Sequence, residues 1–258
     1  MKKLLVLSAA FLFAFTMNAQ KIGVKAGYNM SGYVVNFYSP DGAKMGTGFN
    51  AGLLGEYPVN DMMSLRGEVS FNQLGSDYDS KTDGNWSYRT LGMEYNHNQN
   101  INYLRICVSP KFSFGPVYAF AGPYFAYALS ASQIGTWEGT STLGYPVAGT
   151  GTVDLFSNPK TYNPTEAYSD TNNAGGTGDL INKTDFGLNL GFGANFSGVF
   201  AELNAGLGMK NYINTSSQYY NATNYKTKDD KTVAITGDAT QKNLYFGFSV
   251  GYMLNFEK

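Results

Sequence analysis

The side chains that could support catalysis are few in this chain of 258 residues, and they lie in one polar segment. The single histidine, His97, stands between two asparagines, and Ser76, Asp77 and Asp79 precede it. A histidine beside a hydroxyl or a carboxylate could act as a general base that activates a nucleophile. The spacing singles out no nucleophile, however, and solvated histidines are common in loops. We therefore expect a polar loop here and no enzyme.

The same segment could bind a metal ion, because Asp77, Asp79 and Asp83 carry carboxylate oxygens of the kind that bind Ca²⁺. Lys81 stands where a further ligand belongs, and Gly84 is misplaced relative to an EF-hand loop. One histidine and one cysteine cannot complete a four-ligand Cys/His zinc site. The favoured interpretation is a plain polar turn, and we expect no metal and no cofactor.

Composition narrows the class of protein further. The chain has 18 Lys and Arg against 19 Asp and Glu, so it lacks the basic balance that a nucleic-acid surface needs. Charged residues make up only 14% of the sequence, against about a quarter in soluble domains. Beyond the extreme N-terminus there is no run of apolar residues as long as a helical membrane span. The single thiol, Cys107, is expected to be a small buried side chain and not a reactive group.

The first nineteen residues have the pattern of an export signal. Lys2 and Lys3 give a positive start, residues 4–15 are apolar, and Ala19 ends a short site of small side chains. The apolar stretch is too short for an anchor helix. We therefore expect a signal peptide over residues 1–19, cleaved after Ala19, and one β-barrel over residues 20–258.

The rest of the chain alternates apolar residues with Gly or polar residues, the period of a β-strand with one apolar face. The inward and outward faces of Val117–Leu129 cannot be assigned from the sequence, because both parities carry aromatic and small residues. The alternation predicts eight strands, at residues 22–28, 49–57, 63–72, 103–112, 117–129, 185–193, 199–210 and 243–256.

The polar parity of these strands is mostly Gly, Ser and Asn with isolated charges, which suits a narrow barrel lumen better than the Lys- and Glu-rich face of a soluble sandwich. Short and long connections also alternate along the chain, as they do between periplasmic turns and external loops. The fold class we predict is all-β, an eight-stranded antiparallel up-and-down transmembrane β-barrel. The short connections are 58–61, 115–116 and 196–198, and the long ones are 30–46, 75–99, 130–183 and 211–241.

The connection from Ser130 to Lys183 is too long to be structureless in a compact protein. It is expected to hold an extra hairpin or to extend two strands above the membrane. A barrel of ten strands is therefore the main structural alternative.

The inward parity collects nine charged side chains, nearly balanced in sign, which a packed interior requires because isolated buried charges are costly. We expect an ionic network in two tiers that closes the lumen. Counted from the short turns, the inner tier contains Lys25, Glu56, Arg66, Lys111 and Glu202, and the outer tier contains Glu68, Arg105, Asp185 and Lys210.

The C-terminal strand ends with Ser249, Gly251, Leu254 and the aromatic Phe256, at the spacing of the signal by which outer-membrane barrels are recognised for assembly. The chain therefore resembles the small OmpA/OmpX-type outer-membrane barrels of Gram-negative bacteria. In detail it resembles the outer membrane protein beta-barrel domain proteins (porin family, PorT-like) of Bacteroidota. The segments that carry this resemblance are Asn18-Ala19-Gln20, Gly23-Val24-Lys25-Ala26-Gly27, Tyr103-Leu104 and Ala121-Gly122-Pro123-Tyr124.

This sequence departs from such barrels in two places: Glu257 and Lys258 follow the last aromatic residue, and Arg105-Ile106-Cys107 replaces an expected Glu-Ile-Pro. The resemblance implies a place in the outer membrane, surrounded by lipid and lipopolysaccharide, and assembly by the barrel assembly machinery. For most members it implies no assigned chemistry.

The long connections are rich in tyrosine, whose ring and hydroxyl suit contact with a surface glycan or a protein. The same rings could equally form an external aromatic girdle. Two functions follow: a structural or surface-interaction barrel that works through its loops, or a narrow porin for small solutes. The first is favoured, because eight strands leave an interior only about wide enough for side chains. The tyrosines concerned are Tyr145, Tyr162, Tyr168, Tyr219, Tyr220 and Tyr225.

Overall fold

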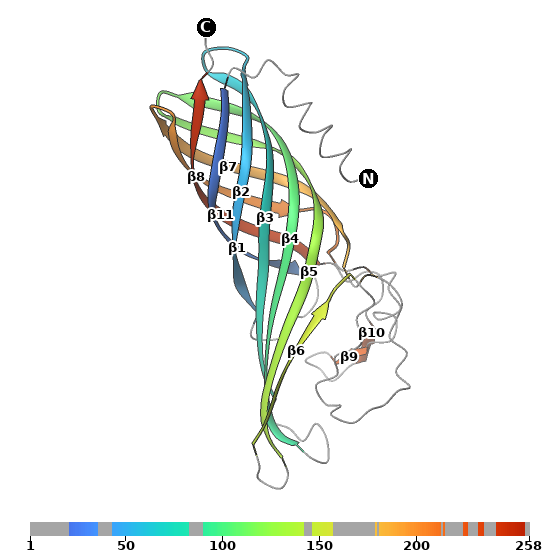
Figure 1. Ribbon diagram of the computed structural model, residues 1–258. Coiled ribbons are helices and arrows are strands. Elements are labelled where there is room, and N and C mark those ends of the chain that lie inside the picture. The colour runs from blue at the N-terminus through green and yellow to red at the C-terminus, as the bar shows by residue number, and fades with distance from the viewer. Residues whose placement is uncertain are drawn as a thin grey trace, which may run out of the picture.

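Eight strands of the computed structural model wind into a tilted barrel (Figure 1). The structure describes residues 21–35, 43–82, 90–141, 146–156, 179, 181–212, 214, 224–226, 232–234 and 241–255. The barrel strands are β1 (Lys21–Val35), β2 (Ala43–Pro58), β3 (Met63–Thr82), β4 (Thr90–Phe114), β5 (Val117–Ser141), β7 (Thr184–Phe196), β8 (Val199–Gly208) and β11 (Gln241–Asn255). Within these ranges no helix is long and apolar enough to cross a membrane.

The barrel closes through antiparallel pairs only. β1 pairs with β2 on one side and with β11 on the other, and β4 pairs with β5. Three further described strands stay outside this ring: β6 (Pro146–Asp154), β9 (Asn224–Lys226) and β10 (Thr232–Ala234). The predicted eight-stranded antiparallel barrel is confirmed, and the ten-strand alternative is wrong because β6 pairs only with β5 within the described chain.

The short connections gather at one end of the barrel. Lys21, at the start of β1, lies opposite Asn255, at the end of β11, and opposite Glu56, near the short turn after β2. The first and last residues of the barrel strands are therefore at the same end of the barrel as the short turns (Figure 1). The turn at Ser197 and Gly198 has positive φ at both residues, 51° and 91°, as a type I′ hairpin requires. These tight turns set the register of each hairpin and hence which side chains face inward.

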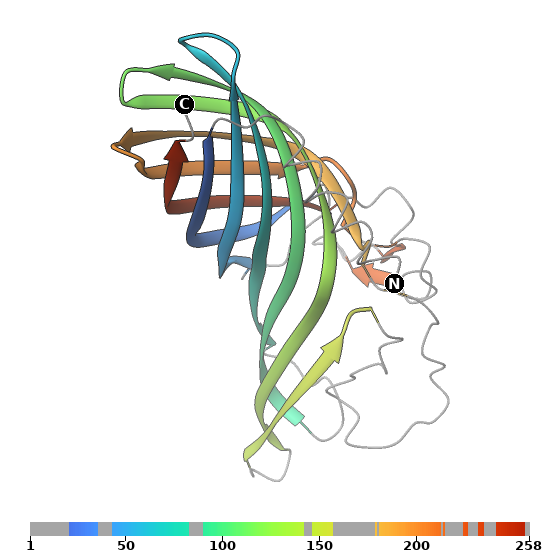
Figure 2. The ribbon, with the colours of Figure 1, turned by 45° about the horizontal axis from the view of Figure 1, so that its top comes forward.

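At the end of the barrel opposite the short turns, the strands are longer than the alternation predicts. β3 continues to Thr82 and β4 begins at Thr90, although the alternation predicts a loop over residues 75–99. β5 reaches Ser141, so it extends into the long connection 130–183. β6 pairs with the outer half of β5, so the expected extra hairpin exists (Figure 2). The predicted strand ends were wrong because both parities are polar in these segments, so the hydrophobic period fades while backbone pairing continues.

The predicted division into inward and outward parities is confirmed where it was made. Leu203 is 47% exposed on the outside of the barrel, whereas its neighbour Asn204 is 7% exposed and faces the lumen. The structure also settles the faces of β5: Tyr118, Phe120 and Tyr124 are buried in the lumen. Aromatic side chains therefore line part of the interior, which the sequence pattern had not shown.

Candidate functional site

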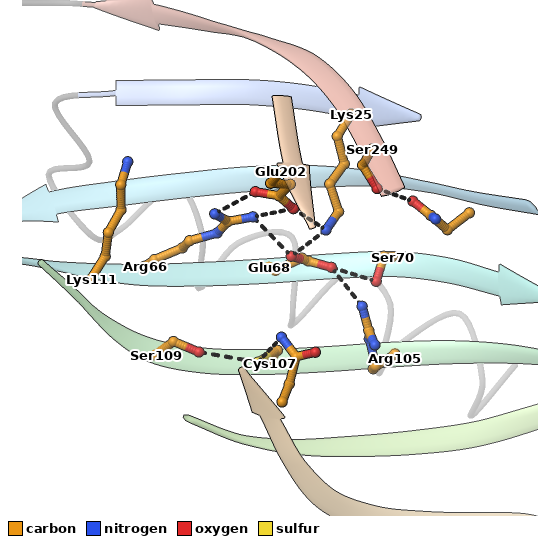
Figure 3. Close-up of polar contacts among 12 residues, drawn as sticks. Lys25, Arg66, Glu68, Ser70, Arg105, Cys107, Ser109, Lys111, Glu202 and Ser249 are labelled. Carbon is orange, nitrogen blue, oxygen red and sulfur yellow. Dashed lines mark hydrogen bonds and ion pairs between the residues drawn. The ribbon is translucent and has the colours of Figure 1, made fainter. Parts of the chain in front are cut away.

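The middle of the lumen holds five interlocked charged side chains, here called the central cluster: Lys25, Arg66, Glu68, Arg105 and Glu202 (Figure 3). Lys25 Nζ lies 2.8 Å from both a Glu68 oxygen and a Glu202 oxygen. Arg66 donates to both oxygens of Glu202, at 2.8 and 3.0 Å. Arg105 reaches the other oxygen of Glu68 at 3.1 Å. Every carboxylate oxygen of the cluster therefore receives at least one cationic donor.

The ion pair between Arg66 and Glu202 crosses the barrel. Arg66 is on β3 and Glu202 is on β8, and these strands are four steps apart in either direction around the ring. The two side chains are 3% and 0% exposed, so water does not screen their attraction. A bridge of this kind joins opposite walls and occupies the space that a solute would need.

A second pair lies apart from the central cluster, towards the short turns. Lys111 Nζ is 2.7 Å from a Glu56 oxygen, and in Figure 3 Lys111 stands away from the other labelled charges. A cavity of about 340 Å³ lies at this end, and its lining includes Glu56, Lys111, Lys21 and Asp61. Lys111 and Glu56 thus line this cavity, whereas no side chain of the central cluster does.

The remaining two predicted lumen charges do not join the cluster. Asp185 accepts hydrogen bonds from the Tyr124 hydroxyl at 3.0 Å and from Asn243 Nδ2 at 2.9 Å. Lys210 is half-buried and donates to the Thr184 hydroxyl.

The expected two tiers are therefore wrong. Glu68, placed in the outer tier, binds Lys25 and Arg66, both placed in the inner one. Depth counted from the turns ignores the tilt and stagger of barrel strands, and it ignores the reach of a long side chain across the lumen.

Five aromatic rings in the lumen each lie against a glycine on the neighbouring strand. Tyr118, Phe120 and Tyr124 of β5 stand opposite Gly193, Gly191 and Gly187 of β7. A Cβ atom built at any of these three glycines would approach the facing ring to between 2.5 and 2.8 Å. At Gly187 and Gly193 the backbone carbonyl of Leu207 or Ala201 would lie closer still, so glycine is needed both for the ring and for the neighbouring backbone.

The same arrangement recurs at two other strand pairs. Tyr245 of β11 lies against Gly206 of β8, and Phe200 of β8 lies against Gly251 of β11. The sequence contained a signal for the β5 rings: residues 118, 120 and 124 have the same spacing, in reverse order, as glycines 193, 191 and 187. Antiparallel pairing brings such mirrored positions together.

Two of the buried cations lie against the faces of these rings. The Arg66 guanidinium lies 4.3 Å from the centroid of Phe120, and Lys111 Nζ lies 4.1 Å from that of Tyr118. Such cation–π contacts are most favourable when desolvated, as they are here. The Tyr118 hydroxyl also donates to Glu202 at 3.1 Å. Cations are thus held both by carboxylates and by rings.

An apolar layer lies at the outer end of the lumen, here called the outer cap: Leu74, Ile101, Tyr103, Leu155, Ile181 and Tyr212. Leu155, Ile181 and Tyr212 come from segments that follow β6, precede β7 and follow β8. They are 2%, 2% and 5% exposed. Gln99 Nε2 donates to the Tyr212 hydroxyl, which ties this segment to β4. The central cluster and the outer cap thus occupy the lumen at two levels.

Of the residues considered for catalysis or calcium, Ser76, Asp77 and Asp79 are on β3 and His97 is on β4, whereas Asp83 and Gly84 lie outside the described residues. His97 is on β4, opposite Tyr78 of β3 and Gly135 of β5. Asp77 of β3 accepts a hydrogen bond from Asn98. An extended strand points successive side chains to opposite faces, so it does not wrap oxygens around an ion as a calcium loop does. Among the described residues no group of three His, Cys, Asp or Glu could hold a metal ion.

The remaining predicted residues fall partly outside the described ranges. Phe256 and the tyrosines 145, 162, 168, 219 and 220 are not among the described residues, and Tyr225 is on β9. Ser249 is fully buried and donates to Asn50 at 2.9 Å, whereas Leu254 is 52% exposed on the outside. Ser249 and Gly251 therefore have packing roles in the lumen, whatever else they do.

A closed antiparallel barrel with an apolar exterior and a charged interior defines a small transmembrane β-barrel. The chain belongs to the outer membrane protein beta-barrel domain family, whose model matches residues 18–214. It is thus an outer-membrane β-barrel. No curated protein sequence matches the chain.

Several solved outer-membrane barrels are similar to this chain. They include the attachment invasion locus protein Ail of Yersinia pestis, at 14% identity and a TM-score of 0.39, over 91% of this chain and 98% of that one. Neisserial surface protein A matches at 10% identity and 0.34, over 90% and 96% of the two chains. CarO2 of Acinetobacter baumannii matches at 13% identity and 0.35, over 90% and 99%.

Proposed function

We propose that this protein is a surface-interaction barrel that works through its external sheet and loops, with a lumen closed to solutes. The observation that carries the proposal is the length of the strands: β4 and β5 each have 25 residues. About 9–11 residues suffice for a tilted strand to cross a membrane. The surplus builds a sheet of β3, β4, β5 and β6 that projects beyond the barrel (Figures 1 and 2).

The filled lumen supports the same proposal. A channel for small solutes would require the central cluster to part, and separating buried ion partners costs several kcal/mol for each charge left alone. The outer cap would also have to open, which would expose side chains that are nearly fully buried. Binding by the external sheet requires neither of these changes.

The finer assignments belong to the same proposal. Residues 1–19 are a signal peptide cleaved after Ala19, and the chain is a PorT-like member of the Bacteroidota proteins. The C-terminal signal formed by Ser249, Gly251, Leu254 and Phe256 is read by the barrel assembly machinery. Lipid and lipopolysaccharide surround the barrel, a surface glycan or protein is the partner of the tyrosine-rich loops, and His97 has no catalytic role.

Two trimmed variants test the proposal. Ser76 lies opposite Gln99, and Ser132 lies opposite Asp154, so each outer hairpin can be cut at a paired position and closed with an Asn-Gly turn. The variants lack residues 77–98 or 133–153. Both should keep the heat-modifiable gel shift of a folded barrel and lose binding to glycan arrays or to whole cells.

Planar bilayers provide the second arm of the test. The unmodified barrel should give at most small, irregular conductance. A large and stable conductance, together with unchanged binding by both trimmed variants, would replace this proposal with the narrow-porin function.

A further inference from the structure

A small cavity of about 10 Å³ lies between the central cluster and the outer cap. Asn72, Arg105 and Asp185 are among the side chains that line it. All three are nearly fully buried, at 2%, 3% and 4% exposure. A polar cavity of this size can hold about one water molecule.

Each of these three side chains has one polar atom without a hydrogen-bond partner: Asn72 Oδ1, Arg105 Nε and Asp185 Oδ1. Their other polar groups are engaged. Asn72 Nδ2 donates to Ser70 at 2.9 Å, the Arg105 terminal nitrogens bind Glu68 and Tyr245, and Asp185 Oδ2 accepts two bonds. A buried polar atom left unpaired is costly, so three of them around one cavity require an explanation.

The three atoms are two acceptors and one donor. A water molecule donates two hydrogen bonds and accepts others, so it matches this set with the roughly three bonds typical of buried waters. A metal cation would be repelled by the Arg105 guanidinium, and an anion by the carboxylate of Asp185. We propose that one buried water binds here, accepts a hydrogen bond from Arg105 Nε, and donates to Asp185 Oδ1 and Asn72 Oδ1.

This water has a role in the charge balance of the lumen. The central cluster contains three cations, Lys25, Arg66 and Arg105, but only two carboxylates, Glu68 and Glu202. Asp185 supplies a third negative charge, and no direct ion pair joins it to Arg105. The water connects the two groups and so couples Asp185 to the cluster. The inference is independent of what the external loops bind.

The Arg105 Nε–H group reports the water directly by NMR of the full-length barrel in nanodiscs. Its ¹H–¹⁵N signal is assigned by its loss in Arg105→Lys, which keeps the charge. We expect a cross-peak between this proton and a slowly exchanging water in a rotating-frame Overhauser experiment. The sign of the cross-peak distinguishes a dipolar contact from chemical exchange. We also expect the cross-peak to vanish in Asn72→Leu, which fills the space and removes one acceptor.

Two results would overturn the inference. One is an Arg105 Nε–H signal with no water cross-peak, which would mean that the arginine contacts Asp185 directly. The other is a cross-peak that persists unchanged in Asn72→Leu while the variant keeps its heat-modifiable gel shift. A high-resolution crystal structure gives a separate check, as one ordered water should lie within hydrogen-bond distance of all three atoms.

Discussion

The two walls of the lumen contribute different kinds of side chain. The first wall, formed by β1 to β4, supplies the buried cations of the described chain, Lys25, Arg66, Arg105 and Lys111. The second wall, formed by β5, β7, β8 and β11, supplies inward glycines and the rings that lie on them. Long cations thus extend from the first wall. They meet ring faces and Glu202 on the second wall, and they also bind Glu68 and Glu56 of their own wall. The difference shows how a narrow barrel can be filled without one uniform kind of side chain.

The second wall depends on glycine for a geometric reason. A ring that stands upright would enter the space of the cations, whereas a ring laid across a glycine stays close to the wall and presents its face. The contacts of Phe120 with Arg66 and of Tyr118 with Lys111 follow from this posture. The glycines therefore help to place the charges even though they carry none.

The largest effect is expected from removing the carboxylate that the second wall contributes to the central cluster. Glu202→Ala leaves Lys25, Arg66 and Arg105 with Glu68 alone, and it should destabilise the barrel by about 3–5 kcal/mol, the cost of unpaired buried charge. Urea titration in lipid vesicles measures this. Arg66→Met combined with Glu202→Leu should recover most of the loss, because an apolar pair can replace a buried ion pair. A double variant as unstable as Glu202→Ala would show that the cross-lumen bridge is not the cause.

The next effect tests whether the difference between the walls is confined to the lumen. Leu53 on the first wall and Leu203 on the second are 46% and 47% exposed on the outside. Leu53→Arg and Leu203→Arg should each cost about 2–4 kcal/mol, because both place a charge in the lipid. The same titration applies, with Asn204→Ala as the inward control. If Asn204→Ala costs as much as Leu203→Arg, the assigned faces of β8 are wrong.

A smaller effect is expected at the glycine beneath Tyr245. A Cβ atom at position 206 would lie 2.2 Å from ring atoms of Tyr245, so Gly206→Ala should cost about 1–3 kcal/mol through overpacking. Gly67→Ala is the matched control, because nothing lies within 4 Å of a Cβ there. In a Tyr245→Ala background the cost of Gly206→Ala should disappear. Equal costs in both backgrounds would mean that the strand and not the ring requires glycine.

The sequence predicted the barrel well because its strongest signal, period-two alternation, is a direct consequence of one face in lipid. Leu203 outside and Asn204 inside follow from it. The signal fails beyond the membrane, where residues such as Ser76 and Gln99 pair as strand although both faces are polar. It also fails in β5, whose two faces both carry aromatic residues.

The site could be predicted only in part. Parity alone identified which charges point inward, but the partners depend on strand stagger and on contacts across the barrel. Glu68 shows this: it lies two residues from Arg66 in sequence, yet it also binds Lys25 and Arg105 of other strands. The inward rings of the second wall were not predicted, because an aromatic residue can be assigned to the lumen only together with the glycine that lies opposite it.

The smallest effect is expected from the ring face itself. Phe120→Leu keeps an apolar side chain beside Gly191 but removes the π face that lies 4.3 Å from the Arg66 guanidinium. Because that contact is desolvated, it should contribute about 0.5–2 kcal/mol. A double-mutant cycle with Arg66→Met isolates the interaction, since Phe120→Leu should cost less once the guanidinium is gone. Phe125→Leu, on the same strand and 49% exposed outside, is the control and should show no coupling to Arg66. If Phe120→Leu costs as much in the Arg66→Met background as in the unmodified protein, the ring acts by volume alone, and the comparison between the walls would then rest on packing and not on charge.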